Sequence, residues 1–187
     1  MICKGEIEMN NEINIRWFRI KDNAIIPTKR DTDAGFDIYT TENNVLLMPH
    51  EKHLFATGLK VAADPGIWLM GFDRGSTGSR GLHVHCGVID NTYRGEIFCC
   101  INNDNDYPVL FTNAVEKPTI ITDAEEKIPG TDTVYHGQAL FYPTTKAILQ
   151  LIPVFQPTVS SKEISAAEWA KFADTDRGEG KLGSSGK

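Results

Sequence analysis

The sequence lacks the features that would place it in a membrane, in an oxidising compartment or around a protein-bound metal. No apolar run in its 187 residues approaches the length of a membrane span, and the opening residues, MICKGEIEMNNE, contain no apolar core of a signal peptide. The four cysteines form no CxxC pair, which disfavours a zinc or thioredoxin-like site. Cys99 and Cys100 should be reduced, buried neighbours on opposite faces of one strand. We therefore expect a cytoplasmic protein with no membrane contact.

The chain also lacks a basic excess. Its 19 Lys and Arg residues face 25 Asp and Glu residues, for a formal net charge of −6. A general nucleic-acid binder more often carries a positive balance, so we expect no nucleic-acid partner. An acidic protein can still bind a phosphorylated small molecule where local cations, backbone N–H groups or a metal supply a positive field.

Short β-branched and aromatic segments recur along the chain, with Gly and Pro between them. The expected strands are residues 13–20, 45–48, 54–61, 67–72, 97–101, 138–141 and 147–155. Many short strands with frequent turn signals predict an all-β sandwich or barrel. One short helix near the C-terminus is expected at Ser165–Phe172, because Ser165 and Glu168 have the spacing of a capping box.

A single domain is expected over residues 1–173, because a chain of this length suits one core. Within it, residues 103–145 are less regular and form either an inserted hairpin or a long surface loop. Residues 174–187, DTDRGEGKLGSSGK, are rich in glycine and have no strand or helix pattern. We expect them to form a flexible C-terminal arm.

The most informative segment is GVIDNTYRGEI, residues 87–97. A turn-tolerant pair, NT, separates strand-like VI from strand-like EIF, which predicts a hairpin with Asp90 and Tyr93 at its tip. Asp90 can accept a proton from water, and Tyr93 can cover a sugar or a ring. On this segment alone, an ordinary hairpin whose aspartate caps its own turn is the simpler interpretation.

Four further segments carry polar groups suited to an anion. DAGFDIY (33–39) brings a carboxylate into a strand, and DRGSTGSRGL (73–82) sets arginines and hydroxyls among glycines, which suits phosphate oxygens or a solvated turn about equally. Gln150 lies in an apolar strand and needs partners if buried, either in a structural network or on a ligand. Arg177 and the GSSG at 183–186 can wrap an anion once ordered, at a cost of roughly 1–2 kcal/mol per residue.

In order and spacing, these five segments resemble the motifs of the trimeric deoxyuridine triphosphatases (dUTP pyrophosphatases). The matching stretches are AGFDIY (34–39), DRGSTGSRGL (73–82), GVIDNTYRGEI (87–97), ILQL (148–151) and RGEGKLGSSG (177–186). The similarity runs from about Ile13 to Gly186 and is interrupted near residues 103–145. It implies an all-β, distorted jelly-roll protomer, the dUTPase-like β-clip, with a C-terminal arm that closes over the active site. It also implies a homotrimer whose sites draw motifs from different subunits.

The resemblance implies hydrolysis of dUTP to dUMP and pyrophosphate with Mg²⁺, which limits uracil incorporation into DNA and supplies dUMP for dTMP synthesis. Asp90 would orient and deprotonate the attacking water, and Tyr93 would pack under the deoxyribose. The other implied substrate contacts are Arg74, Gly75, Ser76 and Gln150 at the phosphates, the backbone of His85, Cys86, Gly87, Val88 and Ile89 at the uracil edge, and Arg177, Leu182, Gly183, Ser184 and Ser185 in the arm. Magnesium would be held by the triphosphate and water with no direct protein ligand, and Asp37 would lie nearby.

The sequence departs from the family pattern in four places. Gly75 stands where the family usually has Ser, so a hydroxyl contact is lost or comes from Ser76. Leu182 replaces the aromatic that usually covers uracil, and Thr145-Lys146 replace a Gly-Asp pair. The stretch 103–145 is longer than the usual connection, as in some phage members, which indicates a phage or prophage source.

Two alternatives stay open. A dCTP deaminase-related enzyme resembles the chain in the second motif, although Cys100 stands where that group has a catalytic Glu. A nucleotide-sensing regulatory protein would bind a protein partner through residues 103–145, and this role can coexist with catalysis.

Overall fold

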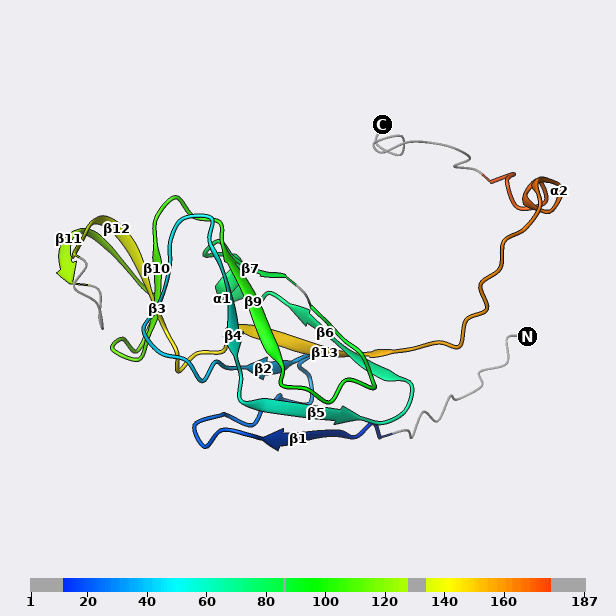
Figure 1. The fold of residues 1–187 in the computed structure, drawn as a ribbon, viewed down its shortest axis with the longest axis horizontal. Helices are drawn as coiled ribbons and strands as arrows, with labels where there is room; N and C mark the ends of the chain where they lie inside the picture. The colour runs from blue at the N-terminus through cyan, green and yellow to red at the C-terminus, as the bar shows by residue number, and fades with distance from the viewer. Residues whose placement is uncertain (1–11, 86, 128–133, 176–187) are drawn as a thin grey trace, which may run out of the picture. The chain divides into compact units, whose positions relative to one another are not determined.

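The computed structural model describes residues 12–85, 87–127 and 134–175. They fall into two compact units, one that ends at Gln156 and one that begins at Pro157. Figure 1 shows that strands make up nearly all regular structure of the first unit. The predicted all-β class is confirmed. Among the described residues, no helix is long and apolar enough to cross a membrane.

The first unit contains thirteen strands and one short helix in its described part. The strands are β1 (Ile15–Arg19), β2 (Phe36–Ile38), β3 (Val45–Leu47), β4 (Lys52–Ala56), β5 (Leu59–Ala63), β6 (Ile67–Phe72), β7 (Leu82–His85), β8 (Val88–Ile89), β9 (Phe98–Asn103), β10 (Val109–Thr112), β11 (Thr119–Lys127), β12 (Val134–Pro143) and β13 (Leu149–Phe155). The helix α1 (Gly75–Gly78) lies between β6 and β7 and was not predicted from the sequence. The strands form sheets in the orders β1-β5, β11-β12-β10-β3, β2-β13-β6-β8 and β4-β9-β7.

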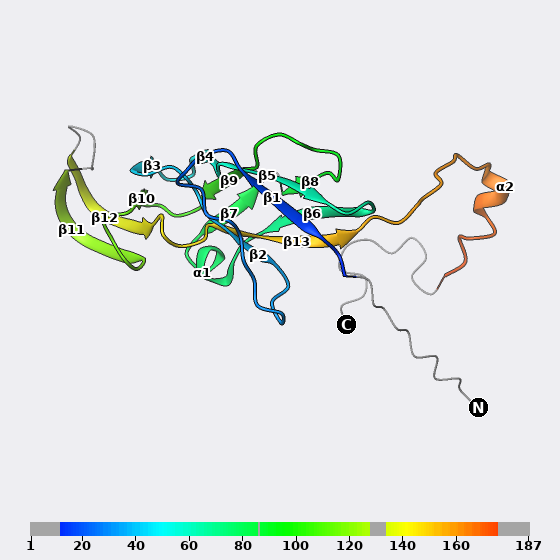
Figure 2. The ribbon, with the colours of Figure 1, turned by 90° about the horizontal axis from the view of Figure 1, so that it is seen from below.

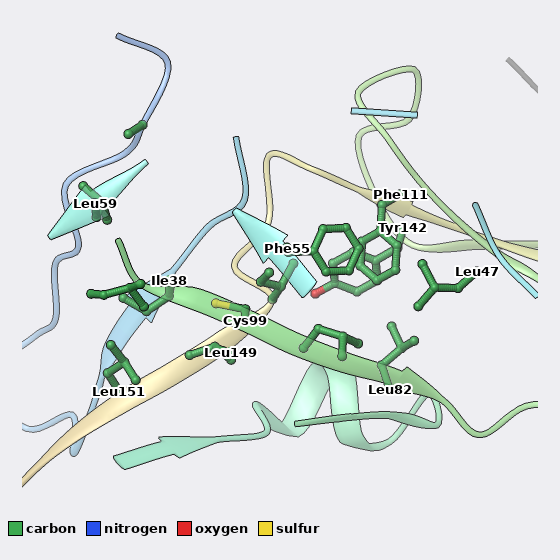
Figure 3. Close-up of a cluster of buried hydrophobic side chains, with 14 of the residues drawn as sticks. Ile38, Leu47, Phe55, Leu59, Leu82, Cys99, Phe111, Tyr142, Leu149 and Leu151 are labelled. Atoms are coloured by element: carbon green, nitrogen blue, oxygen red, sulfur yellow. The ribbon is translucent and has the colours of Figure 1, made fainter. Parts of the chain in front are cut away.

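The sheets enclose one apolar core, part of which Figure 3 shows. Phe111 lies between two other rings, with centroid distances of 4.6 Å to Phe55 and 5.4 Å to Tyr142. Cys99 points into the same core, and burial raises the pKa of its thiol. Its neighbour Cys100, on the opposite face of the strand, is only half-buried, so the expected burial holds for Cys99 but not fully for Cys100. Cys99 is therefore a small core residue, as the sequence predicted.

The strand predicted over residues 54–61 is wrong, because the chain turns within it. Thr57 and Gly58 separate β4 from β5, which belong to different sheets. Gly58 has φ +68°, and a Cβ there would lie 2.9 Å from the Cβ of Ala24. Only glycine meets both conditions without strain, so this position ends the strand.

Residues 103–145 contain an inserted hairpin rather than a long loop. Strands β11 and β12 pair antiparallel, with a register shift between Ile121 and Ala124. Both ribbon views show this hairpin at the end of the first unit that carries β10 and β3 (Figures 1 and 2). The inner half of β12 pairs in parallel with β10, so one strand runs from the insertion into the core sheet.

The second unit carries the predicted C-terminal helix, α2 (Ala166–Trp169), as a single turn where residues 165–172 had been expected. Its predicted capping box is present. The Ser165 hydroxyl accepts the Glu168 N–H at 3.3 Å, and the Glu168 carboxylate accepts the Ser165 N–H at 3.2 Å.

Candidate active site

The first and fourth motifs meet across adjacent strands. The register of β13 sets Gln150 opposite Asp37 of β2 on one side and opposite Phe72 of β6 on the other. The Gln150 amide donates to the backbone oxygen of Asp73 at 2.9 Å. A Cβ on Gly35 would lie 3.2 Å from the Gln150 amide oxygen, so glycine leaves room for this side chain. Gln150 thus belongs to a polar network next to the first motif.

The second motif contains Asp73 and Arg74, the helix α1 and the residues that lead into β7. The Arg74 guanidinium makes a two-pronged contact with the Asp37 carboxylate, Nε to Oδ1 at 2.8 Å and Nη2 to Oδ2 at 2.9 Å. Its Nη1 also donates to the Ser76 hydroxyl at 3.2 Å. Buried Thr77 accepts the Arg74 N–H and donates to the Arg74 carbonyl, both at 3.0 Å. These contacts hold the arginine in one direction.

A buried tyrosine supports the same arginine from the core. The Tyr142 hydroxyl donates to the Ala147 carbonyl at 3.0 Å, and Arg74 Nη1 lies 3.4 Å from that oxygen. Burial raises the pKa of Tyr142, which keeps it a neutral hydrogen-bond donor. Arg74 of the second motif is therefore connected, through the Ala147 carbonyl, to the C-terminal end of β12, the strand that begins in the insertion.

The first, second and fourth motifs border a cavity of about 720 Å³, within the usual range of small-molecule sites. Five residues predicted at or near the substrate line it: Asp37, Arg74, Gly75, Ser76 and Gln150. Gly75 is exposed, and a Cβ there would have no neighbour within 4 Å. The structure thus brings together three segments separated by up to 113 positions (150 − 37).

Sequence reasoning missed one wall of the cavity, the loop of residues 28–33. Arg30 binds Asp33 through Nε and Nη2, with N–O distances from 2.9 to 3.2 Å. This contact raises the pKa of Arg30 and lowers that of Asp33. The available signal was the TKRDTD run directly before the first motif, which is also typical of a solvated loop.

The predicted hairpin over residues 87–97 is wrong. Strand β8 pairs with β6, whereas β9 pairs with β4 and β7, so the flanking strands lie in different sheets. Asp90 and Tyr93 lie in a tight turn between those sheets, closed by the Tyr93 N–H to the Asp90 carbonyl at 3.0 Å. The Asn91 amide anchors the turn on the carbonyls of Asp64 and Ile67, at 2.9 and 2.6 Å.

Tyr93 folds over the glycine of its own motif. Its hydroxyl donates to the Glu96 carbonyl at 2.8 Å, and a Cβ on Gly95 would lie 2.3 Å from the phenolic oxygen. Glycine at 95 is therefore required for this ring position. The ring remains 43% exposed, and Asp90 is exposed as well, so both are available to a ligand.

The residues expected at the uracil edge lie along a close backbone approach. Gly87 accepts the Gly71 N–H at 2.6 Å, and a Cβ on Gly87 would lie 2.6 Å from the Gly71 carbonyl oxygen. His85 and Val88 are exposed, and Ile89 is half-buried. The hollow lined by His85, Gly87 and Ile89 holds only about 10 Å³, room for about one water.

A single chain does not join the two halves of the predicted site. Neither Asp90 nor Tyr93 lines the 720 Å³ cavity. The remaining predicted contacts lie outside the described residues: Cys86, Arg177, Leu182, Gly183, Ser184 and Ser185. Over the part of the chain that the structure covers, no group of three or more His, Cys, Asp or Glu side chains is placed to hold a metal ion.

The all-β fold and a polar cavity that combines arginines, hydroxyls and an amide are typical of a protein that binds a phosphorylated small ligand. A family model described as dUTPase matches residues 21–114. The deoxyuridine 5'-triphosphate nucleotidohydrolase of Mycolicibacterium gilvum is 30% identical over 90% of this chain and 92% of its own length. The chain therefore belongs to the dUTPase family.

Solved phage structures agree with this assignment. The dUTPase of Staphylococcus bacteriophage 80alpha with dUPNHPP is 27% identical, with a TM-score of 0.68 over 93% of this chain and 99% of that one. The dUTPase of phage phi11 of S. aureus, described with a species-specific insert, is also 27% identical, with a TM-score of 0.60 over 82% and 96%. These likenesses confirm the predicted jelly-roll fold and a phage-like member of the family. The family match favours a dUTPase over the dCTP deaminase-related enzyme.

Proposed function

We propose that this protein hydrolyses dUTP to dUMP and pyrophosphate, limits uracil incorporation into DNA and supplies dUMP for dTMP synthesis. The observation that carries the proposal is the cavity in which Arg74, Ser76, Gln150 and Asp37 converge in a member of the dUTPase family. Such a reaction belongs in the cytoplasm of a cell or of a phage-infected host.

Asp90 is the proposed general base. It orients a water and takes its proton as the water oxygen bonds to the α-phosphorus. The bond from that phosphorus to the oxygen bridging to the β-phosphate breaks, and pyrophosphate leaves with the electron pair. Its exposed position in an anchored turn supports this role, because a general base must reach its water in a fixed direction.

The phosphates are proposed to lie in the cavity. Arg74 and Ser76 would donate to phosphate oxygens, with the Gln150 amide beside them and Gly75 leaving open space. Fixed donors stabilise the charge that develops on the leaving group. Tyr93 would pack under the deoxyribose, and the backbone of residues 85–89 would recognise the uracil edge.

Magnesium is proposed as the cofactor. A phage phi11 dUTPase variant, 25% identical to this chain, is described with a structural Mg(II) ion. The donor set of the cavity fits an ion that arrives with the triphosphate, because Asp37 is a carboxylate next to the phosphate-binding arginine. Bound magnesium would neutralise phosphate charge, and Asp37 would face its water shell.

We propose a homotrimer with shared active sites. The separation of Asp90 and Tyr93 from the cavity supports it, because a neighbouring subunit can supply the turn that the cavity lacks. Residues 174–187, with Arg177, Leu182 and Gly183–Ser185, would form an arm that closes over a domain of residues 1–173. Such a lid would exclude water other than the nucleophile.

The β11–β12 hairpin is proposed as the site for a protein partner, which would add a regulatory role to catalysis. It extends the outer edge of a core sheet, and none of its described residues lines the cavity. This role needs no change in the hydrolytic assignment.

Replacing Asp90 tests the hydrolytic proposal. The D90N variant should lower dUTP turnover by about 10²–10⁴-fold, because the amide cannot accept the proton of the nucleophile. Pyrophosphate release with Mg²⁺ measures the rate. D22N, which changes an exposed aspartate outside the cavity, is the matched control and should behave as wild type. Undiminished turnover by D90N would overturn the role of Asp90, and absence of dUTP hydrolysis by wild type would overturn the function.

A further inference from the structure

The loop of residues 28–33 lies outside the five motifs but forms part of the cavity that holds Arg74, Ser76 and Gln150. It carries two cations, Lys29 and Arg30, whose side chains have different partners. The Lys29 ammonium donates to the carbonyls of Arg30 and Asp33, both at 3.1 Å, and lies 6.0 Å from the centre of the Phe36 ring. Lys29 therefore holds the shape of the loop.

Arg30 is placed differently, because its partner is a single side chain at the surface. The Asp33 carboxylate accepts from Nε and Nη2 of the guanidinium and from the Arg30 backbone N–H at 3.1 Å. The Arg30 side chain is still 85% exposed. A guanidinium has five N–H donors, so those on Nη1 and the outer side of Nη2 can donate to a second anion. An exposed pair of this kind adds little stability.

The cavity therefore contains two Arg–Asp pairs of the same design. Arg74 is held on Asp37 by two parallel hydrogen bonds, and Arg30 is held on Asp33 by the same two nitrogens. Each carboxylate compensates one guanidinium. A phosphate that approached the Nε–Nη2 edge of either arginine would compete with its aspartate for those donors.

We propose that Arg30 binds the terminal phosphate of the nucleoside triphosphate, and that Asp33 occupies the arginine until that phosphate arrives. This inference rests on the proposed function, since it assigns a further contact within the same site. It makes Arg30 a determinant of triphosphate over monophosphate binding, with Asp33 as an internal competitor.

The proposal makes two substitutions act in opposite directions. R30Q should weaken binding of the non-hydrolysable analogue dUpNHpp by about tenfold, the size expected for loss of one charged hydrogen bond, and leave dUMP binding within twofold of wild type. D33N should strengthen dUpNHpp binding by about twofold to fivefold, because the arginine loses its competitor. In the R30Q/D33N double variant, the effect of D33N should disappear.

Calorimetric titration with dUpNHpp and with dUMP, both with Mg²⁺, measures these changes. R19Q removes an exposed arginine outside the cavity and is the matched control for charge, with no expected effect on either ligand. Wild-type affinity for dUpNHpp in R30Q, or equal weakening for dUMP, would overturn the proposal. Weaker binding in D33N would also overturn it. If any of these results occurred while wild type still hydrolysed dUTP, the role of Arg30 would be wrong but the proposed function would stand.

Discussion

At the scale of single residues, the glycines that line the 720 Å³ cavity differ in whether they have room for a side chain. Gly35 and Gly75 both line it, yet their surroundings differ. A Cβ on Gly35 would lie 3.1 Å from Ile152 and 3.2 Å from Gln150, whereas one on Gly75 would meet nothing within 4 Å. The glycine at 35 is therefore demanded by packing, and nothing in the packing demands the glycine at 75.

Exchanging each glycine for serine tests this difference. G75S should increase the free energy of unfolding by about 0.5 kcal/mol, because serine forms helix better than glycine. It should also raise kcat/KM for dUTP by about threefold to tenfold through a new hydroxyl contact to phosphate. G35S, the matched substitution, should lower the free energy of unfolding by about 1–3 kcal/mol through overpacking.

Urea unfolding and dUTP turnover measure the two effects. A G75S variant that is as active as wild type but not more so would indicate that Ser76 already supplies the hydroxyl. Equal stability of G35S and G75S would contradict the packing argument.

At the scale of elements, the sequence predicted strands better than it predicted their partners. The strands predicted over residues 67–72 and 147–155 match β6 and all of β13, the second with two residues too many at its start, because apolar and β-branched residues indicate burial locally. The supposed hairpin over residues 87–97 failed because strand pairing is decided by the whole sheet. Val88 pairs with Met70, and the sequence pattern of residues 87–97 does not predict this pairing.

In the candidate site, too, some features could be predicted from the sequence and others depend on the fold. The resemblance of the motifs to the dUTPase family implied Asp37, Arg74, Gly75, Ser76 and Gln150, and the structure gathers them in one cavity. The loop of residues 28–33 was missed because charged residues before a strand look the same whether they face solvent or a ligand. The sequence could not reveal that Asp90 does not line the cavity in one chain, since this depends on which strand β8 pairs with.

The turn that carries Asp90 rests on the β5–β6 connection, where Asp64 ties down β1. The Asp64 carboxylate accepts Arg16 Nη1 at 2.7 Å and the backbone and side-chain amides of Asn14 at 2.9 Å. Hydrogen bonds from Arg16 and Asn14 lower the pKa of Asp64 to about 2. An unfolded aspartate titrates near 3.9, so this stabilisation is present above about pH 4 and is lost as pH falls toward 2.

Comparison of wild type with D64N tests whether ionisation of Asp64 stabilises the fold. Wild type should have the higher free energy of unfolding at pH 5, and the gap should close as pH falls from about 4 to 2. Urea unfolding followed by tryptophan fluorescence at several pH values gives the gap directly, and D22N should show no such trend. A gap that stays constant with pH would contradict the role of the Asp64 carboxylate.

At the scale of the whole molecule, a single chain does not bring its described predicted site residues into one site, because Asp90 and Tyr93 do not line the cavity. The cavity takes its walls from residues 28–37, from the start of α1 and from β13, and Asp90 lies on the turn after β8. If Asp90 is the general base, as proposed, it has to reach a water at the α-phosphorus, and a residue that does not line the cavity of its own chain cannot reach a triphosphate bound there. Assembly of several subunits is the simplest way to complete it, because cyclic symmetry repeats one contact between neighbours around the ring.

Complementation between two inactive variants tests this arrangement. D90N lacks the proposed base and R74Q lacks the proposed phosphate contact, so each should be nearly inactive alone. If the site takes Arg74 from one subunit and Asp90 from another, trimers refolded from an equal mixture should recover about a quarter of wild-type turnover, since both residues are intact in about one site in four. Variants mixed without unfolding should stay inactive, which controls for residual activity. A refolded mixture that also stays inactive, while its mass is that of a trimer, would show that each chain supplies both residues to the same site.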